Sequence, residues 1–298
     1  MSCVIGIDIG GTNFRIGTIF NNGIVENFEI MSSSKLEKEG AEEFINNVIK
    51  DYIKKYDLVD IEAITIGVPS CVKKDTSEII TTPNLKGLEN VNLKEYISEK
   101  FSTNVIVEKD VNLLITDDIQ TNELIKTGEE NIIGLYVGTG FGNGIVINGK
   151  LYKGKNGVAG EIGHIPFLEV DSICGCGNIG CSETRASGWY LRTIQEKYFP
   201  KTELSEIFVK HSNEDILKKY INNVALVAAT EINILDPDYV IFGGGVVSMK
   251  NFPKEELLKL IGEKLRKPYP FENIRYIFSS NTQKSGIRGG YYYFKNNL

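Results

Sequence analysis

One histidine and three cysteines lie close together in the chain and offer four ligands to a metal ion. In the pattern H-x9-C-x-C-x4-C, these residues are His164, Cys174, Cys176 and Cys181. Zinc binds four nitrogen or sulfur ligands tetrahedrally, and a Cys3His set fills that shell, so the zinc would be structural rather than hydrolytic. Gly175, Gly177 and Gly180 permit the tight loop that must wrap around it. The alternative is a set of free buried thiols beside a core histidine.

Two glutamates flank this cluster in the sequence. Glu161 stands three residues before the histidine, and Glu183 stands two residues after the last cysteine. A bound metal would fix both carboxylates together with the loop. Carboxylates beside such a pre-organised site suit the recognition of hydroxyl groups, as in a sugar.

Three glycine clusters have the composition of phosphate-binding turns. They are Asp8-Ile9-Gly10-Gly11-Thr12, Gly138-Thr139-Gly140-Phe141-Gly142 and Gly243-Gly244-Gly245. Glycines allow backbone N–H groups to approach a phosphate closely, and a threonine hydroxyl adds a donor. Neither the Walker A pattern nor G-x-G-x-x-G is present. The alternative for each cluster alone is a tight hairpin turn.

A carboxylate that could act as a general base follows the apolar stretch Asn-Val-Ile-Val. Asp110 could accept a proton from an attacking hydroxyl, and Asn112 could donate and accept hydrogen bonds to a polyol. An aspartate at the end of a strand also serves as a helix cap. The nearby phosphate-type turns favour the catalytic interpretation of Asp110.

The elements that must position these residues form two similar blocks. In the first, a strand, a glycine turn and two further strands are predicted within residues 4–30, followed by a helix near 39–55. The block from residue 131 repeats this design: Ile5-Gly6 matches Ile133-Gly134. We therefore expect an α/β protein of two duplicated domains facing an interdomain cleft. The expected domains are 1–116, with a C-terminal helix near 285–298 packing back on it, and 117–298, which carries the zinc loop.

The composition bounds the class of protein. The 298 residues are 42% hydrophobic, which is enough for two modest cores, and the net charge is −6. Without a long Lys/Arg run, this charge argues against nucleic acid and anionic membranes as partners. No signal peptide and no apolar stretch near eighteen residues is visible, so we expect a cytoplasmic protein. Five cysteines do not make a disulfide scaffold.

Together these motifs resemble the ROK family of sugar kinases and repressors along nearly the whole chain. The most specific stretches are Gly160-Glu161-Ile162-Gly163-His164 and the segment Cys174–Glu183. The resemblance implies the actin-like ATPase fold, which is also called ribonuclease H-like. It further implies ATP with Mg²⁺ as cofactors, a structural zinc and phosphorylation of a hexose.

The resemblance also implies roles for individual residues. Asp110 would be the catalytic base, Asp8 would help to place Mg²⁺ or its waters, and the glycine turns would hold the nucleotide. The sugar contacts it implies are Asn84, Asp110, Asn112, Glu161, His164 and Glu183. A homodimer is a further expectation from the family.

Within the family, several stretches most resemble kinases that form D-allose 6-phosphate, among them GVPSCVKKDTSEIITTPNL and GVAGEIGHIPF. Glucose or N-acetylmannosamine kinases are the alternatives. The family's commoner Glu-Asn-Asp is here Glu108-Lys109-Asp110, which bears on sugar preference. A sugar-sensing repressor is the less favoured hypothesis, because it needs a helix-turn-helix module ahead of the first glycine turn.

Overall fold

The computed structural model describes residues 2–74, 76–81, 85, 87–280 and 282–296, and these form two compact units. Unit 1 comprises Met1–Glu123, Leu151–Ala159 and Asn281–Leu298. Unit 2 comprises Leu124–Lys150 and Gly160–Ser280. Compared with the expected division at residue 116, unit 1 also contains residues 117–123 and 151–159.

Unit 1 is built on a five-stranded sheet with the order β3-β2-β1-β4-β7. Its strands are β1 (Cys3–Ile9), β2 (Asn13–Ile19), β3 (Val25–Ser32), β4 (Ile61–Val68) and β7 (Asn104–Lys109). The β1–β2–β3 meander is antiparallel, and β4 and β7 continue the sheet in parallel with β1. Strand β1 lies in the middle of this mixed sheet and is almost wholly buried. A small hairpin joins β5 (Cys71–Val72) to β6 (Ile79–Thr81).

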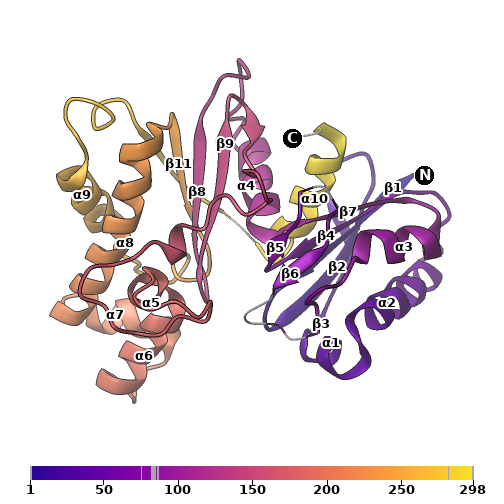
Figure 1. Cartoon of the computed structure of the whole chain (residues 1–298), viewed down its shortest axis with the longest axis horizontal. Coiled ribbons are helices and arrows are strands. Elements are labelled where there is room, and N and C mark those ends of the chain that lie inside the picture. The colour runs from indigo at the N-terminus through magenta and orange to yellow at the C-terminus, as the bar shows by residue number, and fades with distance from the viewer. Residues whose placement is uncertain (1, 75, 82–84, 86, 281, 297–298) are drawn as a thin grey trace. The chain divides into compact units, whose positions relative to one another are not determined.

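Five helices accompany this sheet (Figure 1). They are α1 (Ser34–Glu39), α2 (Ala41–Lys55), α3 (Leu93–Phe101), α4 (Asp110–Thr121) and α10 (Ser285–Asn296). The predicted helix near 39–55 is α2, and Gly40 with φ of 84° separates it from α1. Phe44, Ile45 and Ile49 lie on the buried face of α2, at the three- and four-residue spacing of an amphipathic helix.

The last helix, α10, packs on α4 and on the central strands of unit 1, next to β1 and β4 in Figure 1. Glycines make this close approach possible. A Cβ on Gly289 would lie 1.9 Å from the carbonyl oxygen of Leu113, and one on Gly290 would lie 2.3 Å from Oγ1 of Thr65. Arg288 secures the contact with a bidentate pair to Asp117 of α4.

Unit 2 repeats the sheet, with the order β10-β9-β8-β11-β12. Its strands are β8 (Ile132–Val137), β9 (Phe141–Ile147), β10 (Lys150–Leu151), β11 (Tyr239–Gly243) and β12 (Arg275–Phe278). Its helices are η1 (Ile162–His164), α5 (Glu183–Ala186), α6 (Gly188–Tyr198), η2 (Leu204–Glu206), α7 (Ile207–His211), α8 (Asp215–Leu235) and α9 (Lys254–Lys264). A hydrophobic core of its own, separate from that of unit 1, holds unit 2 together.

The two units share one plan, which confirms the predicted α/β fold with a duplicated domain. In each sheet the first strand pairs antiparallel with the second and parallel with a later one. The matched glycines occupy equivalent places: Gly6 pairs with Gly17 on β2, and Gly134 pairs with Gly144 on β9. The matched turn residues Gly10 and Gly138 each donate a backbone hydrogen bond across the turn.

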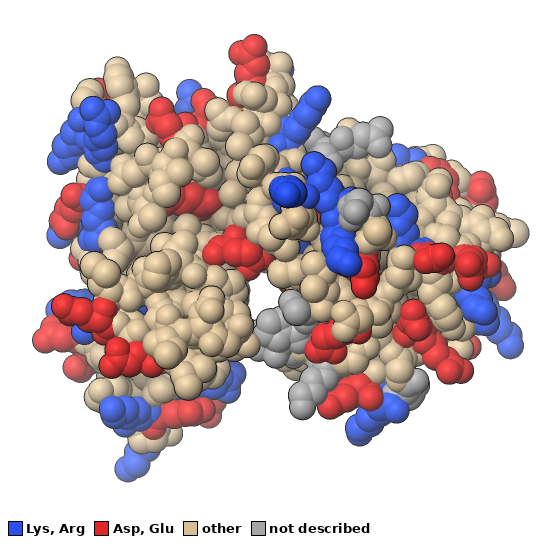
Figure 2. Space-filling model, in the orientation of Figure 1, with Lys and Arg blue, Asp and Glu red and all other residues tan. Residues whose placement is uncertain are grey.

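The surface carries both signs of charge. Figure 2 shows Lys and Arg side chains interspersed with Asp and Glu on the face in view, in keeping with the modest net charge of −6. Among the residues that the structure describes, no helix combines the length and the apolar character needed to cross a membrane.

Candidate active site

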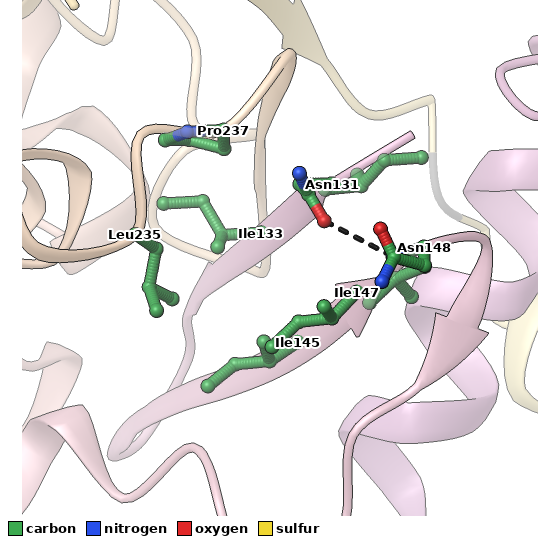
Figure 3. Close-up of a pocket in the computed structure, with 9 residues that line it drawn as sticks. Asn131, Ile133, Ile145, Ile147, Asn148, Leu235 and Pro237 are labelled. Carbon is green, nitrogen blue, oxygen red and sulfur yellow. Dashed lines mark hydrogen bonds between the residues drawn. The ribbon is translucent and has the colours of Figure 1, made fainter. Parts of the chain in front are cut away.

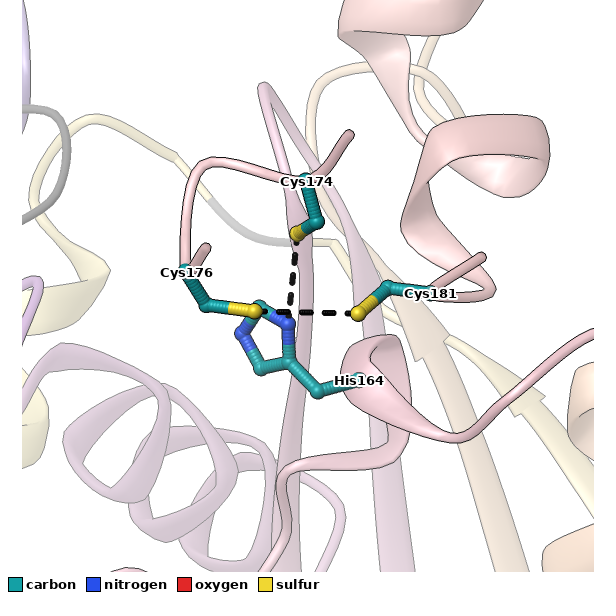
Figure 4. Close-up of side chains that lie close together, drawn as sticks. All are labelled: His164, Cys174, Cys176 and Cys181. Atoms are coloured by element: carbon teal, nitrogen blue, oxygen red, sulfur yellow. Dashed lines mark hydrogen bonds between the residues drawn. The ribbon is translucent and has the colours of Figure 1, made fainter. Parts of the chain in front are cut away.

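The four side chains predicted to bind a metal converge in unit 2 and point toward a common centre (Figure 4). One ligand atom from each lies within 4.8 Å of the others. Sγ of Cys174 is 3.6 Å from Nδ1 of His164, and Sγ of Cys176 is 3.6 Å from Sγ of Cys181. Zinc–sulfur bonds of about 2.3 Å in a tetrahedron place the sulfurs about 3.8 Å apart. The cluster therefore has the chemistry and spacing of a four-coordinate zinc site.

The loop that carries the cysteines is shaped by its own backbone. Cys174 N–H donates to the carbonyl of Asn178, and Gly177 N–H donates back to Cys174. Gly177 and Gly180 have φ of 92° and 81°, a region that disfavours side chains. A Cβ on Gly180 would also meet the carbonyl oxygen of Val170 at 2.7 Å. Of the three glycines predicted to permit the tight loop, Gly177 and Gly180 therefore have a backbone conformation that favours glycine.

Both predicted glutamates lie against this cluster. Oε2 of Glu161 is 3.6 Å from Nε2 of His164, the ring nitrogen that faces away from the thiols. Oε1 of Glu183 is 3.2 Å from Sγ of Cys174 and 4.0 Å from Nδ1 of His164. Burial, with Glu183 adding to it, raises the pKa of the Cys174 thiol. Both carboxylates stay partly exposed, at 37% and 23%, and can therefore reach a ligand.

Glu183 also touches the glycine turn between β8 and β9. A Cβ on Gly140 would lie 2.9 Å from Oε2 of Glu183, so the absence of a side chain there makes room for the carboxylate. The carbonyls of Gly138 and Thr139 accept hydrogen bonds from Gly188 and Trp189, which fixes the turn against the start of α6. One carboxylate of the metal loop and one phosphate-type turn are therefore neighbours.

The Gly243–Gly245 cluster joins this group. Val246 N–H donates to the carbonyl of Val137, at the end of β8. Gly244 has φ of 91°, and a Cβ there would lie 2.5 Å from the same carbonyl. Two of the three predicted phosphate turns thus lie beside each other in unit 2, at the carboxyl ends of parallel strands, where ligands of α/β sheets bind.

The third turn, Asp8–Thr12, belongs to unit 1 and is fixed by Ser33. The Ser33 hydroxyl donates to the carbonyl of Gly10, and its N–H donates to Thr12. Gly11 and Thr12 remain exposed, so their donors can face a ligand. Asp8 pairs with Nη1 of Arg15 at 2.9 Å. Burial raises the pKa of Asp8, with Arg15 opposing the shift.

Asp110 begins α4, directly after β7. Its Oδ1 accepts the N–H of Val111 at 2.7 Å, while the N-cap residue is Lys109, so Asp110 is the first residue inside the helix. Two residues later, Asn112 is buried and donates from Nδ2 to Oε1 of Glu108 at 2.9 Å. Lys109, the departure from Glu-Asn-Asp, is buried, and its Nζ donates to the carbonyl of Ala159 at 3.2 Å.

The second histidine, His211, lies away from the metal cluster. It is half-buried: its Nε2 lies 2.9 Å from Oγ1 of Thr202 and its ring stacks on Phe199 at 4.0 Å. Asn84, which the resemblance placed at the sugar, lies outside the described residues.

The sequence did not predict two polar contacts that lie close to the candidate site residues. Lys153 and Tyr293 surround Glu108 in unit 1, and Glu231 bonds to Asn143 in unit 2. Single lysine and tyrosine residues far apart in the chain carry no local signal of such contacts.

A separate cavity of about 180 Å³ lies at the other end of β8 (Figure 3). Ile133, Ile145 and Leu235 give it apolar walls, and Asn131 accepts the N–H of Asn148 at its rim. Because β8 begins beside this cavity and ends at the Gly138 turn, the cavity is not part of the site described above.

Comparison with known proteins agrees with this arrangement. The ROK family model matches residues 4–297. The glucokinase of Thermotoga maritima is 25% identical over 263 residues, which cover 82% of each chain. The xylose repressor of Caldicellulosiruptor bescii is 29% identical over 286 residues, or 88% of this chain and 70% of the repressor.

A solved structure with the same fold is that of a ROK family glucokinase from Streptomyces griseus in complex with glucose and AMPPNP. It superposes with a TM-score of 0.78 at 24% identity and covers 97% of both chains. The actin-like ATPase fold expected from the sequence is therefore confirmed.

Proposed function

This chain belongs to the ROK family, and we propose that within it the chain is an ATP-dependent kinase that phosphorylates the 6-hydroxyl of a hexose. The observation that carries the proposal is the contact of Glu183 with both the metal cluster and the Gly140 turn. This contact brings a carboxylate that could bind a hydroxyl next to a phosphate-type turn, an arrangement that suits phosphoryl transfer to a sugar. The similarity to a glucokinase supports the same reaction.

ATP is the proposed phosphoryl donor. The backbone N–H groups of the turns at Gly10–Thr12, Gly138–Gly140 and Gly243–Gly245 would cradle its phosphates. Asp8 offers a carboxylate oxygen, which Mg²⁺ prefers, either directly or through water. Bound Mg²⁺ would neutralise charge that develops on the phosphoryl oxygens. The AMPPNP in the related Streptomyces griseus structure is an ATP analogue, which supports this donor.

Asp110 is the proposed catalytic base. It is the first residue of α4, directly after β7, so the helix fixes its backbone. As the sugar 6-hydroxyl attacks the γ-phosphorus in line, Asp110 would accept its proton, and the bond to ADP would break. Asn112, two residues later, would hydrogen-bond to the sugar.

Glu161, His164 and Glu183 are proposed to orient the sugar in unit 2, and Asn84 is proposed as a further contact. The cluster fits zinc in donor type and spacing, so we propose a structural Zn²⁺ held by His164 and the three cysteines. Zinc binds cysteine as the thiolate, so the Cys174 S–H bond to Glu183 would be lost on binding. Oε1 of Glu183 would then be available to a sugar hydroxyl.

D-Allose is the proposed hexose, on the strength of the sequence stretches that resemble D-allose kinases. Glucose and N-acetylmannosamine are the alternatives. Allose and glucose differ in the configuration of the hydroxyl at carbon 3. The wrong sugar would leave a buried polar group of the site without its partner, which costs about 1–3 kcal/mol. A coupled ATP assay across allose, glucose, fructose, mannose and N-acetylmannosamine tests the proposal. We expect allose to have the highest kcat/KM. If none of these sugars supports ATP turnover, the kinase proposal is refuted.

A sugar-binding repressor is the second candidate, because a xylose repressor matches over 88% of this chain. It predicts sugar binding without phosphoryl transfer. Fluorescence anisotropy with promoter DNA, with and without sugar, distinguishes the repressor from the kinase. We expect the protein to be a kinase and not to bind the DNA tightly. We further propose that the protein is cytoplasmic and forms a homodimer. Light scattering of the purified protein would test the homodimer.

A further inference from the structure

A half-buried lysine and a half-buried tyrosine meet a buried glutamate at the end of β7, next to the start of α4. Nζ of Lys153 pairs with Oε2 of Glu108, whose side chain is only 4% exposed. The Tyr293 hydroxyl lies 2.6 Å from the same Nζ, and its ring centre is 5.1 Å from it. Lys153 comes from the segment 151–159 and Tyr293 from α10, so three distant parts of unit 1 meet here.

Glu108 accepts hydrogen bonds on both of its carboxylate oxygens. Lys153 binds one oxygen, while the other accepts hydrogen bonds from Lys109 N–H at 3.0 Å and from Nδ2 of Asn112 at 2.9 Å. Burial lowers the pKa of Lys153, while its contacts with Glu108 and Tyr293 raise it. The second effect is larger, so the pKa of Lys153 is raised overall. The Lys153 ammonium therefore stays charged beside Glu108.

The donors around Glu108 determine which way the neighbouring amide points. Both oxygens of Glu108 accept from Lys153, Lys109 N–H and Asn112, and Asn112 contributes its NH₂ group to this contact. The carbonyl oxygen Oδ1 is then the atom that Asn112 offers elsewhere.

We propose that Lys153, braced by Tyr293, is a positioning residue that fixes Asn112 through Glu108, so that Asn112 presents a hydrogen-bond acceptor to one hydroxyl of the sugar. The proposal rests on the sugar-kinase function proposed above. It assigns a role to the tyrosine-rich C-terminal helix, which supplies the brace. It also predicts how Asn112 selects the sugar: the sugar must carry a hydroxyl group at one position that donates a hydrogen bond to Asn112.

The donor requirement is tested with monodeoxyfluoro analogues of the best sugar, because fluorine removes the donor and keeps the size. In the wild-type protein, fluorine at one ring position is expected to lower kcat/KM by about 10–100-fold. In Lys153→Met the amide is free to rotate, so the loss at that position is expected to shrink to about 3-fold or less. An equal loss in both proteins would overturn the proposal.

Matched variants separate positioning from folding. We expect Lys153→Met to raise the KM for the sugar about 10-fold and to leave the KM for ATP within about twofold. Tyr293→Phe keeps the ring and is expected to give a smaller rise, while Lys153→Arg restores most of the affinity. Lys155→Met makes the same change at an exposed position of the same segment and should match the wild type. An unchanged sugar KM in folded Lys153→Met contradicts the role.

The Asn112 side-chain amide gives a readout that does not depend on activity. Its two N–H signals, assigned by their loss in Asn112→Asp, are expected to exchange slowly with solvent in the wild type and in Lys155→Met. In Lys153→Met they are expected to exchange at least about tenfold faster. Equal exchange rates would overturn the inference even if the kinase is active. If no sugar is phosphorylated, the proposed function fails, and this measurement still decides whether Lys153 fixes Asn112.

Discussion

Asn143 and Glu231 form a buried hydrogen bond in unit 2, with Nδ2 of Asn143 donating to Oε2 of Glu231 across 3.0 Å. The pair lies behind the turn that leads to Glu161, since a Cβ on Gly160 would be 2.5 Å from the carbonyl oxygen of Asn143. Burial raises the pKa of Glu231 to about 8, although the bond from Asn143 opposes the shift. The folded protein therefore prefers this carboxyl group protonated.

The first prediction concerns stability against pH. Between the ordinary value of 4.5 and about 8, the folded state holds a proton that the unfolded state has released. The free energy of unfolding therefore falls as pH rises through this window, by up to about 1.4 kcal/mol per pH unit from this group. Glu231→Gln keeps an acceptor for Asn143 and removes the ionisation.

We expect Glu231→Gln to melt higher than the wild type at pH 8 and close to it at pH 5. Thermal unfolding followed by circular dichroism across this range measures the difference. Glu196→Gln, on the exposed face of α6, is the matched control and should leave the pH profile unchanged. A constant difference between Glu231→Gln and the wild type at every pH would contradict the assignment.

The second prediction concerns the metal. We expect about one zinc per chain by elemental analysis of the purified protein, and a lower melting temperature after chelation, because metal binding and loop folding are coupled. Cys176→Ser removes one ligand and is expected to lose most of the zinc and to raise the sugar KM at least about tenfold. Cys71→Ser, outside the cluster, should retain the metal. Metal-free protein with full activity would exclude the proposed zinc site.

The sequence predicted features that depend on local pattern or on repetition. Gly6 and Gly134 revealed the duplicated sheets because each fold unit repeats the same strand and turn. The metal cluster was predictable because His164 and Cys181 lie close in the chain, and ligand chemistry requires them to meet.

What could not be predicted depends on contacts between distant segments. Tyr293 and Lys153 are 140 residues apart, and the tyrosine-rich composition of α10 gave no hint of a polar contact. His211 has charged neighbours in the sequence, yet the ring of Phe199, twelve residues earlier, stacks on it. For Asp110, a helix-terminal role and a catalytic role both suit the sequence around it, and turnover distinguishes them.

The third prediction addresses that choice. If Asp110 is the base, Asp110→Asn keeps the size of the side chain and lowers kcat by about 10²–10⁴-fold, because the amide cannot accept the proton. Sugar affinity by calorimetry is expected to change little. If Asp110 were only a cap, asparagine would replace it well and turnover would stay near normal. Asp51→Asn, on the exposed face of α2, controls for the loss of one charge.

The fourth prediction uses two glycines of one turn as a matched pair. A Cβ on Gly140 would meet Oε2 of Glu183 at 2.9 Å, whereas a Cβ on Gly138 would meet nothing within 4 Å. Gly140→Ala therefore has to displace the Glu183 carboxylate, and Gly138→Ala does not. We expect Gly140→Ala to raise the sugar KM about tenfold and Gly138→Ala to leave it within about twofold, as measured by initial rates at saturating ATP. Equal sugar KM values in the two variants would show that Glu183 does not bind the sugar from this position.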